Sequence, residues 1–297
     1  MDTSSWTLIL VILKFASYLS TSMLIGYVFV TAGGGKLLLT SQPWPMGGMA
    51  AYFQIGMVVG VIAVLLTLPV QVIYVAGAGI EGLKEAFWWA LVWSGADADS
   101  LRLRALALGL ILVSQMLKIF KLPGPILNLL AIAGALTLVS SFGLRGHSVT
   151  LGMVGQGALI LHLLILTIWA GCLWPLYRAC ELLNTENLKS LMSNFGIYAQ
   201  IPILLLAVTG GYLAVRLLQS WATLFETSYG LLLSAKLVLV CAVLMLAAKH
   251  RFWLVPQLDS DAALVAKLAR SIRWEMVLVG LIFLVTAFFT TTTGPGH

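Results

Sequence analysis

The chain has 297 residues, of which 60% are hydrophobic and 9% are charged, and its formal net charge is +6 at pH 7. Soluble domains contain about 25% charged residues, so this composition excludes a soluble globular protein for most of the chain. The chain has no Gly-Lys-Ser/Thr phosphate-binding loop and no strand-borne Gly-x-Gly-x-x-Gly motif, which disfavours a nucleotide-driven pump. We therefore expect a membrane protein that is not an enzyme.

Apolar stretches of membrane-spanning length follow one another along the chain. A spanning helix needs roughly 20 apolar residues. About eight stretches meet this requirement: Trp6–Thr31, Met49–Val75, Leu101–Phe120, Ile126–Phe142, Leu151–Tyr177, Phe195–Leu218, Tyr229–Ala248 and Met276–Thr292. The sequence thus predicts an all-α polytopic membrane protein with about eight transmembrane helices, surrounded by membrane lipid.

Lysine and arginine are unevenly divided between the two sides that this topology creates. With the N-terminus outside, one side holds Lys36, Lys118, Lys121, Arg178, Lys189, Lys249, Arg251, Lys267, Arg270 and Arg273, and the other holds Lys84, Arg102, Arg104, Arg145 and Arg216. The richer side is normally cytoplasmic, which predicts both termini outside (N-out/C-out). A cytoplasmic membrane surface attracts basic residues, so the isoelectric point near 9.3 requires no nucleic-acid partner.

The segment Gly79–Ser94 is too interrupted at its start to span a membrane. Its aromatic residues Phe87, Trp88, Trp89 and Trp93 instead predict a short helix in the outer interface, over the outer mouth or at a partner surface. We expect two halves: residues 1–150, with four helices and this interfacial helix near 79–94, and residues 151–297, with four more.

Histidines are the best transition-metal ligands among these apolar stretches. His162 lies about 16 Å along the fifth predicted helix, near the bilayer middle. His147 and His297 fall on the outer side, where Met153 could add a thioether. Imidazole and thioether suit a copper ion. Structural roles are the alternatives: a hydrogen bond to a neighbouring helix for His162, and solvated loop or tail positions for the other two histidines.

Three further side chains, Trp169, Tyr229 and Lys236, are placed to line a path near His162. Trp169 follows His162 by seven residues and Lys236 follows Tyr229 by seven, so each pair shares one helix face. Lys236, about 12 Å into its helix, could balance an anionic ligand or gate a pathway. Alternatively it snorkels or bonds to helix carbonyls.

A second polar cluster is expected toward the cytoplasm. His250 ends the seventh predicted helix, and Glu275 precedes the eighth. Glu275 could pair with Arg251 or Arg273 and fix the helix hairpin. The functional alternative is an inner gate or exit site built from His250 and Glu275, and the spacing does not separate the two.

Several motifs together resemble the CopD/PcoD copper-resistance membrane proteins. The resemblance covers residues 156–292. It rests on Leu161–Leu164, Trp169–Leu176, Thr209–Gly211, Thr227–Gly230, Lys236, Ala247–Arg251 and Arg270–Glu275. It implies a copper protein of the bacterial inner membrane that works with a periplasmic copper carrier of the CopC type.

These observations favour copper uptake from the periplasm, with the ion passing from an outer site at His147, His297 and Met153 to His162. Weak sequential sites suit conduction better than one tight cage. One alternative is a haem b electron-transfer protein, which would need two facing axial histidines. Another is a copper-binding sensor or assembly partner that transports nothing. The sequence leaves the oligomeric state open.

Overall fold

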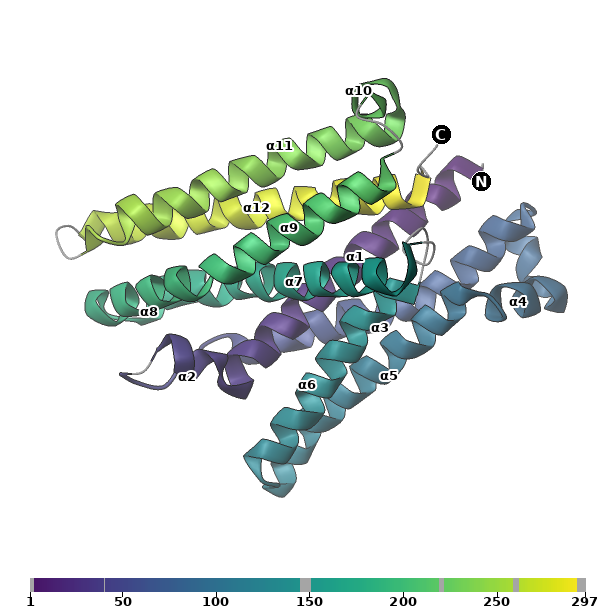
Figure 1. Ribbon diagram of the computed structural model, residues 1–297. Helices are drawn as coiled ribbons and strands as arrows, with labels where there is room; N and C mark the ends of the chain where they lie inside the picture. The colour runs from purple at the N-terminus through teal and green to yellow at the C-terminus, as the bar shows by residue number, and fades with distance from the viewer. Residues whose placement is uncertain (1–2, 40, 145–150, 219–221, 259–261, 293–297) are drawn as a thin grey trace.

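The computed structural model describes residues 3–39, 41–144, 151–218, 222–258 and 262–292, and every regular element in these residues is helical (Figure 1). The α-helices are α1 (Thr3–Phe29), α2 (Gly35–Leu38), α3 (Met49–Ala76), α4 (Ala86–Trp93), α5 (Ala96–Met116), α6 (Gly124–Ser140), α7 (Gly152–Leu182), α8 (Thr185–Tyr198), α9 (Gln200–Leu217), α10 (Thr223–Glu226), α11 (Ser228–Lys249) and α12 (Ala262–Thr292). In this described part of the chain, eight stretches are long and apolar enough to cross a membrane. The all-α polytopic fold is thereby confirmed.

The last spanning helix begins earlier than its hydropathy predicts. α12 starts at Ala262 rather than at Met276, so Arg270, Arg273 and Glu275 lie within its first half. Arginine is a good helix former with a long stem that can carry its charge to the membrane surface. Charged residues therefore end an apolar stretch in the sequence without ending the helix.

α1 belongs to the predicted N-terminal half and packs against helices of both halves, namely α3, α6, α7 and α12. Its closest approach is to α7, where two glycines face each other. A Cβ on Gly26 would lie 2.3 Å from the backbone of Gly171, and a Cβ on Gly171 would lie 2.0 Å from the carbonyl oxygen of Ser22. Tyr52 of α3 donates its hydroxyl hydrogen to the Gly171 carbonyl at 2.9 Å. Three helices thus meet at a point where only glycine fits on α7.

The remaining helices form two groups on either side of α1. α3, α5 and α6 pack on one side, with the α5–α6 hairpin diverging from the rest (Figure 1), while α7, α9, α11 and α12 form the other group. The described start of α1 and end of α12 lie at the same end of the molecule. The ammonium of Lys14 connects these helices, since it donates to the carbonyl oxygen of Thr290 at 2.9 Å.

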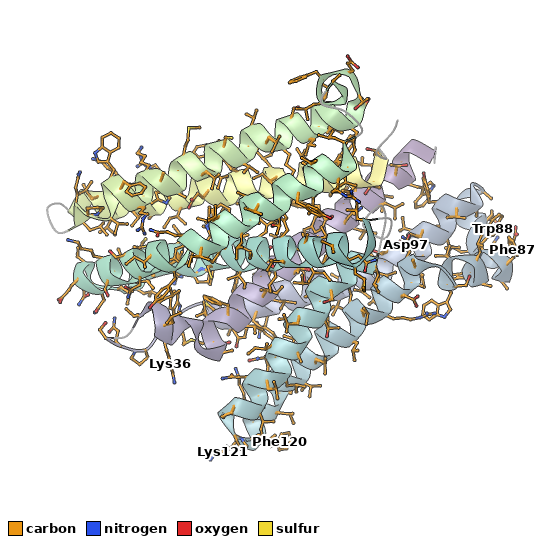
Figure 2. All side chains as sticks on the ribbon, in the orientation of Figure 1. Lys36, Phe87, Trp88, Asp97, Phe120 and Lys121 are labelled. Carbon is orange, nitrogen blue, oxygen red and sulfur yellow. The ribbon has the colours of Figure 1, made fainter. Side chains whose placement is uncertain are left out.

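The aromatic segment after α3 forms a short helix, as expected. α4 packs against α3 and α5, and its Phe87 and Trp93 side chains are 64% and 50% exposed. Figure 2 shows Phe87 and Trp88 at the opposite end of the molecule from Lys36 and Lys121. The aromatic segment and these lysines thus lie at opposite ends of the spanning helices, and the N-out/C-out orientation stays a prediction.

Candidate functional site

His162 extends from α7 toward α9, where its imidazole lies against a glycine. Its Nδ1 is 3.2 Å from the carbonyl oxygen of Leu206 and 3.2 Å from the hydroxyl oxygen of Thr209. A Cβ on Gly210 would lie 2.9 Å from the ring carbon Cε1. We call His162, Leu206, Thr209 and Gly210 the His162 site.

The contacts of the ring decide which nitrogen carries the proton. A carbonyl oxygen only accepts hydrogen bonds, so the 3.2 Å contact with Leu206 identifies Nδ1 as the N–H donor. Thr209 donates its own hydrogen to Leu205 O at 2.7 Å and offers a lone pair to the imidazole. Nε2 therefore carries the ring's lone pair, and no described residue hydrogen-bonds to it. This arrangement is typical of metal-binding histidines, whose second nitrogen donates to a carbonyl or hydroxyl.

Lys236 and Tyr229 lie on α11 beside the last turns of α12. The Tyr229 ring packs edge-on against Phe289, with the centroids 5.3 Å apart, and the Lys236 ammonium lies 5.9 Å from the same Phe289 centroid. Lys236 and Tyr229 thus share one aromatic neighbour on α12 and stay predicted pathway residues.

Trp169 lies partly buried against the main apolar core. Two residues further along α7, Gly171 makes the close contact with α1. Trp169 itself stays a predicted pathway residue.

Met153, the predicted outer ligand that the structure describes, does not lie next to His162. Met153 is 89% exposed at the start of α7, and nine residues of helix place it about 14 Å from His162 along the axis. His147 and His297 fall outside the described residues. Within the described residues no three His, Cys, Asp or Glu side chains come together as a metal site. His162 is the predicted histidine ligand that lies within the described residues.

His250 and Glu275 meet at the opposite end of the helices. Glu275 Oε2 lies 3.4 Å from His250 Nδ1, and both side chains are nearly buried, at 4% and 12% exposure. His250 Nε2 lies 2.6 Å from the hydroxyl of Ser271, one turn before Glu275 on α12. The ion pair of Glu275 is therefore with His250, while Arg273 lies over the Tyr177 ring at 5.8 Å. Ser271 was not foreseen, because its role depends on the register between α11 and α12.

Arg104 is a buried polar residue that the topology analysis placed on the outer side. It is 3% exposed in the middle of α5, which begins at Ala96 rather than at Leu101. Its Nε donates to the Ser141 hydroxyl at 3.2 Å, and its guanidinium lies 4.1 Å from the centroid of the Phe142 ring. These contacts join α5 to the end of α6.

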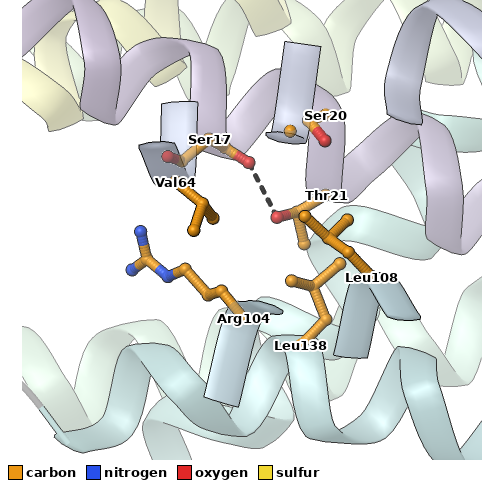
Figure 3. A pocket seen from close by; sticks show the side chains of 8 residues that line it. Ser17, Ser20, Thr21, Val64, Arg104, Leu108 and Leu138 are labelled. Carbon is orange, nitrogen blue, oxygen red and sulfur yellow. Dashed lines mark hydrogen bonds between the residues drawn. The ribbon is translucent and has the colours of Figure 1, made fainter. Parts of the chain in front are cut away.

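Arg104 also borders a cavity of about 10 Å³ between α1, α3, α5 and α6, enough for about one water molecule (Figure 3). Its lining consists of Ser17, Ser20, Thr21, Gly60, Val64, Arg104, Leu108 and Leu138. The three hydroxyl groups donate to the backbone carbonyls of Leu13, Gly56 and Ser17. The cavity is small, and the hydroxyl groups that line it are hydrogen-bonded to the surrounding helices. It therefore belongs to the packing of the N-terminal half.

The described histidines bear on the haem alternative. His162 lies against Gly210, whereas Arg251, the neighbour of His250 in the chain, lies against Gly196. The two glycines are 14 residues apart on the span Thr185–Leu217, about 21 Å. One haem cannot take both as axial ligands, since these must face each other across a single iron. A haem site would have to use His147 or His297 together with His162.

The fold and the His162 site define a polytopic all-α membrane protein that holds one imidazole between two spanning helices. Residues 189–289 match the family model CopD, described as copper resistance protein D. The match confirms the resemblance seen in the motifs and supports a role in copper resistance or copper transport. It includes Thr209, Gly210, Lys236, His250 and Glu275, whereas His162 precedes it. No curated protein and no solved structure matches the chain.

Proposed function

We propose that this protein conducts copper across the bacterial inner membrane, inward from the periplasm, with His162 as the ligand inside the membrane. The observation that carries the proposal is the geometry of the imidazole. Its Nδ1 is engaged by Leu206 and Thr209, which leaves the lone pair of Nε2 available to an ion. The copper-resistance family match over residues 189–289 supports copper as that ion.

A single imidazole suits an ion in transit. Copper accepts few ligands and exchanges readily between imidazole and thioether, so a sparse site can bind it briefly and release it. In the proposal His147, His297 and Met153 receive the ion at the outer surface, where a CopC-like periplasmic carrier delivers it. Trp169 lines the route next to His162.

The ion pair between His250 and Glu275 belongs to the inner end of the proposed route. It joins α11 to α12 with both side chains nearly buried. An ion leaving at this end would have to pass the pair or open it. His250 and Glu275 act here as a gate.

His162→Ala is the test, with His250→Ala as a matched control that removes the other described histidine. We expect His162→Ala to abolish copper accumulation in cells and copper flux into proteoliposomes, at unchanged levels of protein in the membrane. The control should still bind copper in the purified protein. Unchanged flux in His162→Ala would remove His162 from the route. Stoichiometric copper binding by the wild type without flux would instead identify a copper-binding partner or sensor.

A further inference from the structure

We propose that one face of the hairpin formed by α11 and α12 binds the headgroup of an anionic phospholipid. The face consists of Lys249 at the end of α11, Trp253 in the π-helical turn that follows it, and Arg270 and Trp274 on α12. We call these four residues the hairpin face. The inference goes beyond the proposed function, because it assigns a lipid site and uses none of the proposed copper ligands.

The contact between His250 and Ser271 fixes the register of the two antiparallel helices, which lie side by side (Figure 1). His250 Nε2 lies 2.6 Å from the Ser271 hydroxyl oxygen, so these residues face each other across the hairpin. Two antiparallel helices are related by a two-fold axis normal to their common plane, so equal steps along both chains from a facing pair lead to the same face. One step back and three steps forward, which are four residues apart and share a helix face, lead to Lys249, Arg270, Trp253 and Trp274.

The opposite face of the hairpin is covered by protein. One step forward from the facing pair leads to Arg251 and Ile272. Nη1 of Arg251 lies 2.8 Å from the position of a Cβ on Gly196 of α8, and Ile272 is 2% exposed. The hairpin face is open by contrast, since its two tryptophans are 67% and 59% exposed and both of its basic residues are exposed.

An exposed apolar stripe continues the hairpin face along both helices. Its side chains are between 41% and 68% exposed, and they are Val238 and Met245 on α11 and Val277, Leu281 and Leu284 on α12. Steps of three, four or seven residues connect them to one another and to the basic residue of each helix, so each helix keeps one face. Apolar side chains thus give way to aromatic and basic ones, as acyl chains give way to the interface and the phosphates in a bilayer leaflet. A phospholipid can place its acyl chains on the stripe and its phosphate at the two basic residues.

Carboxylates do not neutralise the hairpin face within the part of the chain that the structure describes. Lys249 and Arg270 form no ion pair there. The helices packed against the hairpin are α1, α7, α8 and α10, and the acidic residues on these helices and on α12 are paired or distant. They are Glu275, paired with His250; Glu181, paired with Arg178; Glu186, ten residues before Gly196; and Glu226, which precedes the first residue of α11. Asp259 and Asp261 fall outside the described residues. Two basic residues beside an apolar stripe therefore match a lipid with a net negative charge.

The experiment titrates phosphatidylglycerol, and separately phosphatidylcholine, into the purified full-length protein in detergent and counts bound lipid by native mass spectrometry. We expect the wild type to prefer phosphatidylglycerol. The double substitution Lys249→Gln/Arg270→Gln should weaken phosphatidylglycerol binding about 25-fold, which is about fivefold for each basic residue removed from a membrane surface, and leave phosphatidylcholine binding unchanged. Lys249→Arg/Arg270→Lys keeps both charges and should retain the preference of the wild type.

Lys84→Gln/Arg102→Gln is the matched control, because it removes two exposed basic residues that are already paired with Glu81 and Asp99. It should bind phosphatidylglycerol within about twofold of the wild type. Equal binding of the two lipids by the wild type, an unchanged double variant, or an equal loss in the control would overturn the inference, and an equal loss would indicate attraction by net charge alone.

Inorganic phosphate, added at the concentration of the lipid, should not displace phosphatidylglycerol. Displacement would overturn the inference as well, since the residues would then bind a phosphate ion without acyl chains. Thermal unfolding in the absence of added lipid checks that each variant is folded. The single substitutions Lys249→Gln and Arg270→Gln, each with an expected loss of about fivefold, take the place of the double variant if it does not fold.

Discussion

His162 and His250 are both histidines between spanning helices, but their surroundings use the imidazole differently. At His250 both ring nitrogens are engaged, one by Ser271 and one by Glu275. At His162 a carbonyl and a hydroxyl share Nδ1, and Nε2 has no described hydrogen-bond partner. His250 also has a carboxylate as its neighbour, with Glu275 Oε2 at 3.4 Å from its Nδ1.

The difference shows how a polar residue inside a membrane can serve either packing or ligand binding. An imidazole whose two nitrogens are both bonded contributes to helix association and has no lone pair to offer. An imidazole that is oriented through one nitrogen presents the other to an incoming ion. Burial alone does not separate the two roles, whereas the use of each nitrogen does.

The largest expected effect comes from a substitution at the contact between α7 and α1, on which both regions depend. Gly171→Ala would place a methyl group 2.0 Å from the Ser22 carbonyl, in a contact of two backbones that cannot yield. We expect a loss of about 3 kcal/mol or more, with little folded protein recovered after solubilisation. Size-exclusion chromatography and thermal unfolding would measure it.

Gly157→Ala is the control on the same helix, since nothing lies within 4 Å of its added Cβ. If Gly171→Ala were as stable as Gly157→Ala, the packing of α7 on α1 would not be what holds the two regions in one structure.

A smaller change should affect only the His162 region. Gly210→Ala would place a methyl group 2.9 Å from Cε1 of His162 and turn the ring away from Thr209. Because loss of the group that orients a ligand typically weakens metal binding by about 10- to 100-fold, we expect a decrease of at least about tenfold in copper affinity. Gly211→Ala, next along α9 and in open space, should bind copper like the wild type. Equal affinities of the two variants would show that the orientation of the ring is unimportant.

The smallest expected effect is that of a substitution in the His250 region, which should leave copper binding unchanged. Glu275→Gln removes the charge of a nearly buried pair, and we expect a loss of about 1–3 kcal/mol of stability in thermal unfolding. Copper affinity at the distant His162 should stay within about twofold of the wild type, because this pair touches none of the residues of the His162 site.

Glu181→Gln is its control, since it removes the acid from a more exposed pair with Arg178 and should cost less than about 1 kcal/mol. A large fall in copper affinity in Glu275→Gln would couple the two regions and contradict their separation.

The amino-acid sequence was sufficient for the spanning helices and for the position of His162 along its helix. Hydropathy locates apolar stretches, but it placed the starts of α5 and α12 too late, because Asp97 and Arg270 lie inside helices. Asp97 occupies a first helical turn, where the helix dipole favours an acid.

The partners of the two histidines could not be predicted in the same way. Thr209 lies 47 residues after His162, and Ser271 lies 21 residues after His250. Only the rotation and register of packed helices bring such pairs together, and no short-range pattern encodes them. The burial of Arg104 was missed for a related reason, since counting arginines by side assumes that each reaches the membrane surface.

The bond from Lys14 to Thr290 has a consequence for biosynthesis. The first helix leaves the ribosome some 276 residues before the carbonyl that accepts its ammonium proton. α1 also takes neighbours from early, middle and late parts of the chain, namely α3, α7 and α12. Insertion can therefore proceed one segment at a time, whereas assembly around α1 is completed only when the final helix arrives. A nascent chain that stopped before α12 would retain its apolar spans and lack the closing contact between its two ends.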